Sequence, residues 1–145
     1  MGACTSSKTP AFDDAGRLEL QLVISRPVNV LTVYQNTNVG FSNAHQSRLT
    51  HDLMGLKKFA KEFDPYMHCE GSSPEKKKKL QERRRSRSEE EKLLLGKLWT
   101  LYLLAQRFTS WGQLTRIQDK ERVSHSIQLF IQTHAEMMDI LVRFS

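Results

Sequence analysis

Hydrophobic and polar residues alternate near the start of the chain. The alternation covers residues 18 to 24, with Glu19 and Gln21 on the polar face and four apolar side chains opposite, Leu18, Leu20, Leu22 and Ile24. A period of two residues is typical of a β-strand that is buried on one side only. This stretch is therefore predicted to be a half-buried strand.

The residues that follow extend this prediction to a small sheet. The Arg26-Pro27 pair interrupts the alternation, and the β-branched run from Val28 to Tyr34 predicts a second strand. The polar residues 35–38 predict a turn, and a short third strand is expected at residues 39–41. Because two or three strands are not stable alone in water, we expect helices to cover them.

The spacing of apolar residues changes to three and four between Ser47 and Phe63. One face then collects most of the apolar side chains, namely Leu49, Leu53, Leu56, Phe59, Ala60 and Phe63. This spacing predicts an amphipathic helix, which the Asp64-Pro65 pair ends. We expect it to pack on the sheet; the alternative is a basic helix on a membrane surface, which Gly55 and the modest charge of its polar face disfavour.

The last third of the chain predicts two further helices. The first is apolar almost all round from Leu93 to Phe108, and Trp111-Gly112 is expected to form a turn. The second runs from about Gln113 to Phe144 and carries an apolar stripe with the members Ile127, Phe130, Ile131, His134, Met137, Met138, Leu141 and Phe144. We expect a helical hairpin that forms the core and self-associates, because so small a chain has few other ways to cover such apolar helices.

Together these patterns predict an α+β fold that is mostly helical. A small N-terminal β-hairpin or sheet packs on one amphipathic helix, and a C-terminal helical hairpin follows. The expected divisions are a flexible lipidated tether (1–16), strands plus helix (17–69), a basic linker or charged helix (70–88) and the hairpin (89–145).

Composition and charge narrow the class of partner. The chain has 145 residues, and its net charge of +6 and pI near 9.5 favour acidic partners such as anionic lipid or nucleic acid. Its two cysteines, Cys4 and Cys69, make no disulfide framework, and no signal peptide is evident, which favours a reducing cytosolic compartment. The longest apolar run, Leu93 to Ala105, is too short to span a bilayer, so any membrane attachment is expected from one side.

The segment EGSSPEKKKKLQERRRSRSEEEK is another informative part of the chain. Between residues 76 and 87 it has eight basic residues, diluted by Glu75 and Glu82, namely Lys76, Lys77, Lys78, Lys79, Arg83, Arg84, Arg85 and Arg87. Ser73-Pro74 is a helix start, and Ser88 with Glu91 forms a capping-box pattern for the next helix. The pattern leaves open whether the run between them is helix or linker. It fits a lipid-binding patch, a nuclear localisation or phosphate-binding strip, or a solvated linker.

The first residues, MGACTSSK, suggest lipid attachment. Met1, Gly2 and Ser6 fit the pattern for N-myristoylation of Gly2 after removal of Met1. One myristoyl chain binds membranes only marginally, and Cys4 supplies an S-palmitoylation site as the second signal. The alternative is a chance match in a disordered terminus; we favour double acylation.

Residues 1–8 resemble the N-termini of doubly acylated signalling proteins and of myristoylated viral matrix proteins. A myristoyl group and a basic patch on a helical body also resemble viral matrix proteins, retroviral ones included. The resemblance implies a protein held at a membrane. The chain departs from the matrix pattern because its basic cluster is internal and predicted strands precede it.

No pattern in the chain indicates catalysis. The seven glycines are scattered and form no phosphate-binding loop, and the five histidines lack the spacing of metal ligands, so no cofactor or metal is expected. His68-Cys69 is an isolated pair in which Cys69 is expected to be a partly buried thiol. His134 is expected to be a hydrogen-bonded core residue.

The sequence therefore favours a non-enzymatic adaptor or matrix-like scaffold on the cytoplasmic face of the plasma membrane or an endomembrane. Its expected partners are anionic lipids and a second copy or another helical protein. The alternative is a nucleic-acid-binding or nuclear-shuttling accessory protein, viral origin included, that uses residues 76–87. Ser86 and Ser88 lie among arginines and are predicted phosphorylation sites that would weaken attraction to anionic lipid.

Overall fold

The computed structural model describes residues 13–36, 40–64, 73–85 and 87–144. Within these ranges 88% of the residues are helical and none lies in a β-strand. The elements, in chain order, are α2 (Asp14–Asn36), α3 (Asn43–Phe63), α4 (Pro74–Arg85), α5 (Glu89–Trp111), the 3₁₀ turn η3 (Leu114–Arg116) and α6 (Lys120–Val142). The predicted α+β fold with an N-terminal sheet is therefore wrong, and the described chain is all helical.

The two main predicted strands are parts of one helix, α2. Its core-facing residues recur every three or four positions, and the buried apolar set is Leu20, Ile24, Pro27, Val30, Leu31 and Tyr34. Leu18 and Leu22 were assigned to the same face as Leu20, yet they are 58% and 48% exposed. The apparent period of two therefore included apolar residues four positions apart, a spacing that a helix also produces. Residues 37–39 lie outside the described residues, and Gly40 and Phe41 form no strand.

Pro27 does not end α2, although a proline removes one backbone hydrogen bond of a helix. It is buried in the interior of the fold, where its ring adds apolar contact area. At the start of the helix, the Asp13 carboxylate accepts a hydrogen bond from the Gly16 backbone N–H at 2.8 Å. Tertiary packing and this cap therefore hold α2 together across the proline.

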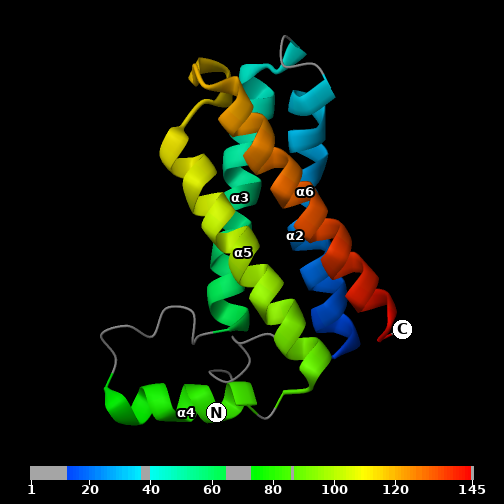
Figure 1. Cartoon of the computed structure of the whole chain (residues 1–145), viewed down its shortest axis with the longest axis vertical. Coiled ribbons are helices and arrows are strands. Elements are labelled where there is room, and N and C mark those ends of the chain that lie inside the picture. Colours follow the sequence, from blue (N-terminus) through cyan, green and yellow to red (C-terminus); the bar gives the residue numbers. More distant parts are fainter. Residues whose placement is uncertain (1–12, 37–39, 65–72, 86, 145) are drawn as a thin grey trace.

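Four of the helices, α2, α3, α5 and α6, form an antiparallel bundle (Figure 1). Around the bundle α2 packs on α3, α3 on α5, α5 on α6, and α6 on α2. Each helix therefore buries one broad stripe against two neighbours. The two C-terminal helices lie side by side, but they are half of this bundle rather than the core on their own.

The helix predicted from Ser47 to Phe63 is confirmed as α3, which begins four residues earlier. All six apolar residues of the predicted stripe are buried. Ser42 caps the helix, because its hydroxyl accepts the His45 backbone N–H at 3.2 Å while the His45 ring accepts the Ser42 backbone N–H at 3.1 Å. The prediction that this helix packs on a sheet was wrong, but the prediction of its buried face is confirmed.

The predicted turn at Trp111-Gly112 is confirmed, since α5 ends at Trp111 and Gly112 has a φ of 78°. The next helix, α6, starts later than expected, at Lys120, with the Asp119 carboxylate accepting the Arg122 backbone N–H at 3.0 Å. Between α5 and α6, Lys97 Nζ donates a hydrogen bond to Glu136 Oε1 at 2.9 Å. This hydrogen bond lowers the pKa of Glu136.

His134 is confirmed as a hydrogen-bonded histidine on the inner side of α6. Its Nε2 lies 3.0 Å from the Ser25 hydroxyl of α2. Partial burial lowers the pKa of His134 below its usual value of 6.5, because desolvation disfavours the charged imidazolium. The contact links α2 to α6.

Candidate functional site

The basic run forms a helix, α4, that stands apart from the bundle. It lies across the end of the molecule where α3 finishes and α5 begins (Figure 1). The Ser73 hydroxyl caps it by accepting the Lys76 backbone N–H at 3.2 Å. The side chains of Lys76, Lys77, Lys78, Lys79 and Arg85 are exposed, and Arg83 and Arg84 belong to the same helix. The question between helix and linker is thus answered in favour of a helix.

Nearly all of the net charge of the protein resides on α4. The helix holds seven Lys and Arg against two Glu, a net +5 out of the +6 of the whole chain. The remainder of the protein is therefore close to neutral. An anionic partner is attracted mainly to this one end of the molecule.

The side chains of α4 suit charge-based binding rather than insertion into a bilayer. Leu80 is the only large apolar residue of the helix, so α4 has no apolar stripe. Glu75 and Glu82 are seven residues apart and share one face, which leaves Lys76, Lys77 and Leu80 on the other. The helix also has no aromatic residue on which a nucleic-acid base could stack.

Arg87, the last cation of the run, is engaged within the protein. Its guanidinium donates to Glu91 Oε2 at 3.3 Å and lies 5.5 Å from the centre of the Phe63 ring. Only 15% of the Arg87 side chain is exposed. Arg87 therefore joins the start of α5 to the end of α3, and less of its charge is available to a partner than that of the exposed lysines.

Ser88 is the N-cap of α5. Its hydroxyl accepts the Glu91 backbone N–H at 3.2 Å and lies 3.2 Å from Glu91 Oε1, to which it donates. Three glutamates occupy the first turn, where the positive end of the helix dipole favours them. Ser88 itself is exposed. Ser86 lies outside the described residues.

The predicted lipidation sites, Gly2 and Cys4, also lie outside the described residues, as do His68 and Cys69. The described chain begins at Asp13, at the start of α2. Because α2 and α3 are antiparallel, this start lies at the same end of the bundle as α4 (Figure 1). In the ranges that the structure covers, no helix is both long enough and apolar enough to traverse a bilayer.

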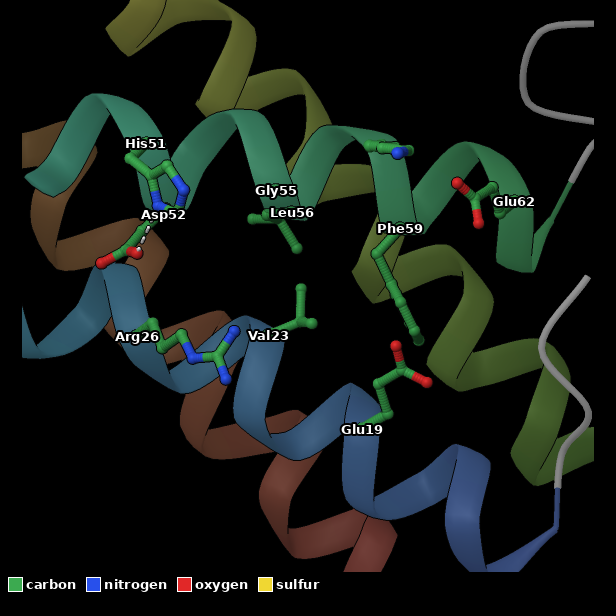
Figure 2. Close-up of a pocket in the computed structure, with 10 residues that line it drawn as sticks. Glu19, Val23, Arg26, His51, Asp52, Gly55, Leu56, Phe59 and Glu62 are labelled. Carbon is green, nitrogen blue, oxygen red and sulfur yellow. Dashed lines mark ion pairs between the residues drawn. The ribbon is translucent and has the colours of Figure 1, made fainter. Parts of the chain in front are cut away.

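A groove between α2 and α3 is the second candidate site (Figure 2). It contains a cavity of about 270 Å³ with an apolar floor of Val23, Leu56 and Phe59, beside Gly55. A neighbouring cavity of about 420 Å³ extends it and shares with it Arg26, His51 and Asp52. The sequence did not indicate this groove, because a period of two places Val23 on the polar face of the predicted strand, away from the helix expected to cover the sheet.

Charges line both ends of the groove. Asp52 is only 10% exposed and contacts the exposed His51 ring, with Oδ1 and Nδ1 separated by 3.5 Å. Arg26 lies across from Asp52 on α2, and Glu19 lies further along α2 toward Phe59 (Figure 2). No set of His, Cys, Asp and Glu among the described residues is suited to hold a metal ion.

Comparisons of the chain with protein-family models, with curated proteins and with solved structures find no match.

Proposed function

We propose that this protein is a non-enzymatic adaptor or scaffold attached to the cytosolic face of a membrane. Myristoyl-Gly2, palmitoyl-Cys4 and the basic helix α4 hold it there. The observation that carries the proposal is the placement of a net charge of +5 on one helix outside the bundle. A helix without an apolar stripe gains nothing by burial, so its exposed lysines serve binding rather than folding.

The two attachment signals act at the same end of the protein. Eight residues lie between Cys4 and Asp13, and the nine steps of chain span at most about 30 Å. A membrane that contacts the α4 end of the bundle is therefore within reach of the acyl groups. One membrane surface can engage both signals.

The energies of the two signals complement each other. A single myristoyl chain binds with an association constant of about 10⁴ M⁻¹, which is too weak for stable attachment. Each lysine near an anionic surface adds up to about 1 kcal/mol. Because Lys76 to Lys79 point around the whole helix, about half of them face a flat surface at once.

Phosphorylation would reverse part of this attraction. A phosphate on Ser86 or Ser88 adds a charge of about −1.5 to −2 beside α4. Two phosphates would cancel about three to four of its positive charges. The arginines that precede each of these hydroxyls provide the context that basic-directed kinases select.

Vesicle binding tests the role of α4 in the full chain without acylation. Changing Lys76 and Lys77 to Gln should weaken binding to phosphatidylserine vesicles several-fold, up to about 30-fold, and raised salt should weaken the parent. The matched control changes the exposed Arg48 and Arg116 to Gln, which removes the same charge near the opposite end of the bundle. The proposal would be contradicted if the two double variants lost the same vesicle affinity, or if binding of the parent did not depend on salt. Tighter binding to duplex DNA or RNA than to vesicles would favour the nucleic-acid function.

A second experiment tests the acyl anchors in eukaryotic cells. Gly2→Ala should release the protein from membranes, because alanine accepts no myristate and palmitoylation follows membrane contact. Cys4→Ser should leave a weaker association through one chain. Membrane fractionation and intact mass are the measurements. The acyl anchor would be refuted if both variants fractionated with membranes like the parent, or if the intact mass of the protein showed no acyl groups.

A further inference from the structure

The outer face of α2 is unusually apolar for a surface helix. Leu18 and Leu22 are 58% and 48% exposed and follow one another by one helical turn. Neither leucine lines the groove between α2 and α3, and Leu18 instead lines a cavity with Leu141 and Phe144. The two leucines thus form an apolar step on α2 that is largely open to solvent.

The charges on this face are uncompensated within the described chain. Glu19 and Arg26 line the groove and are exposed, and neither takes part in an ion pair there. Glu19 lies three residues before Leu22, and Arg26 lies four residues after it. The two opposite charges are therefore arranged nearly symmetrically about the exposed leucine.

We propose that this face binds a second copy of the chain, with the two α2 helices antiparallel and a two-fold axis close to Leu22. Leu22 of each copy then packs against Leu22 of the other copy. The same axis places each Glu19 against the partner's Arg26.

Charge complementarity favours a second copy, and favours the antiparallel arrangement. A two-fold axis across α2 makes two identical Glu19–Arg26 pairs at once, which is the self-complementary pattern of an isologous dimer. If the helices were parallel, each Arg26 would face the partner's Arg26. Like charges in contact across an interface disfavour association strongly.

The dimer has a consequence for membrane attachment, although it does not depend on it. Antiparallel α2 helices place the two α4 helices at opposite ends of the dimer. The 23 residues of α2 span about 34 Å, so two acyl tethers would contact one bilayer along the length of the dimer. Two anchors per particle would strengthen the attachment by avidity.

A charge-swap experiment on the full, non-acylated chain tests the proposal. Sedimentation velocity from about 1 µM to about 100 µM should show the parent at twice its monomer mass of 16.8 kDa. Glu19→Arg and Arg26→Glu should each raise the dimer dissociation constant at least about ten-fold. The double variant should restore dimerisation. Asp139→Arg, a charge reversal at an exposed position of α6, should leave it unchanged.

A second variant tests the apolar contact independently of charge. Leu22→Gln changes a position that is 48% exposed in the monomer, so the melting temperature of the dilute monomer should change little while the dimer dissociation constant rises at least about ten-fold. A parent that stays monomeric at about 100 µM would overturn the proposal. So would single charge variants that dimerise like the parent, or a double variant that stays monomeric. None of these results depends on lipid binding, so they leave the proposed membrane function to its own tests.

Discussion

Leu18 and Leu20 of α2 provide a matched pair of truncations that tests the helical register of this segment. Leu20 is 1% exposed, whereas Leu18 is 58% exposed. Replacing a buried leucine by alanine costs about 2 to 5 kcal/mol, because it removes apolar contacts and leaves a cavity. The same substitution at a mostly exposed position changes stability by about 0.5 kcal/mol. Leu20→Ala should therefore cost several times more than Leu18→Ala.

Urea unfolding followed by far-ultraviolet circular dichroism measures both variants against the parent. Leu20→Ala should also lower the melting temperature by about 6 to 15 °C, at roughly 3 °C per kcal/mol for a domain of this size. A strand would place both leucines on one face and give similar losses. Similar losses for the two variants, or a larger loss for Leu18→Ala, would refute the helical assignment of α2.

Four further predictions concern α5 and α6. Ser88→Ala should cost about 1 kcal/mol in urea unfolding because the Glu91 N–H loses its acceptor, whereas Ser88→Asn should retain the cap. Ser88→Asp should bind phosphatidylserine vesicles more weakly than Ser88→Asn, and equal binding would contradict an electrostatic switch. Because burial lowers the pKa of His134, the unfolded chain takes up the proton first, so stability should fall as pH drops below about 6.5. His134→Gln should flatten this pH dependence of the urea midpoint. Leu101→Asp places a charge at a fully buried position and should abolish cooperative thermal unfolding, and a variant that melts like the parent would exclude this placement.

The error in α2 has a specific cause in the sequence. Leu20 and Ile24 belong both to an alternating pattern and to a helical one, because a spacing of four satisfies either period. Leu18 and Leu22 complete the alternating pattern, and Pro27 is a residue that normally interrupts a helix. Proline is uncommon inside a helix, and leucine is uncommon on its exposed face. The local patterns alone therefore favoured strands.

Other parts of the structure followed directly from local chemistry. The buried stripe of α3 and the turn at Gly112 could be predicted from residues close together in the chain. So could the N-cap at Ser88 and the placement of the positive charge in one segment. Each depends on interactions between residues a few positions apart, which the sequence displays in full.

The sequence by itself thus determined the helices with clear apolar stripes, their caps and the charge of α4. Only the tertiary structure decided that α2 is a helix, that α4 stands outside the bundle, and that Val23 and Gly55 line one groove. The physical reason is that these features depend on contacts between helices. Burial against α3 and α6 stabilises α2 despite Pro27, and the groove exists only where α2 and α3 pack side by side.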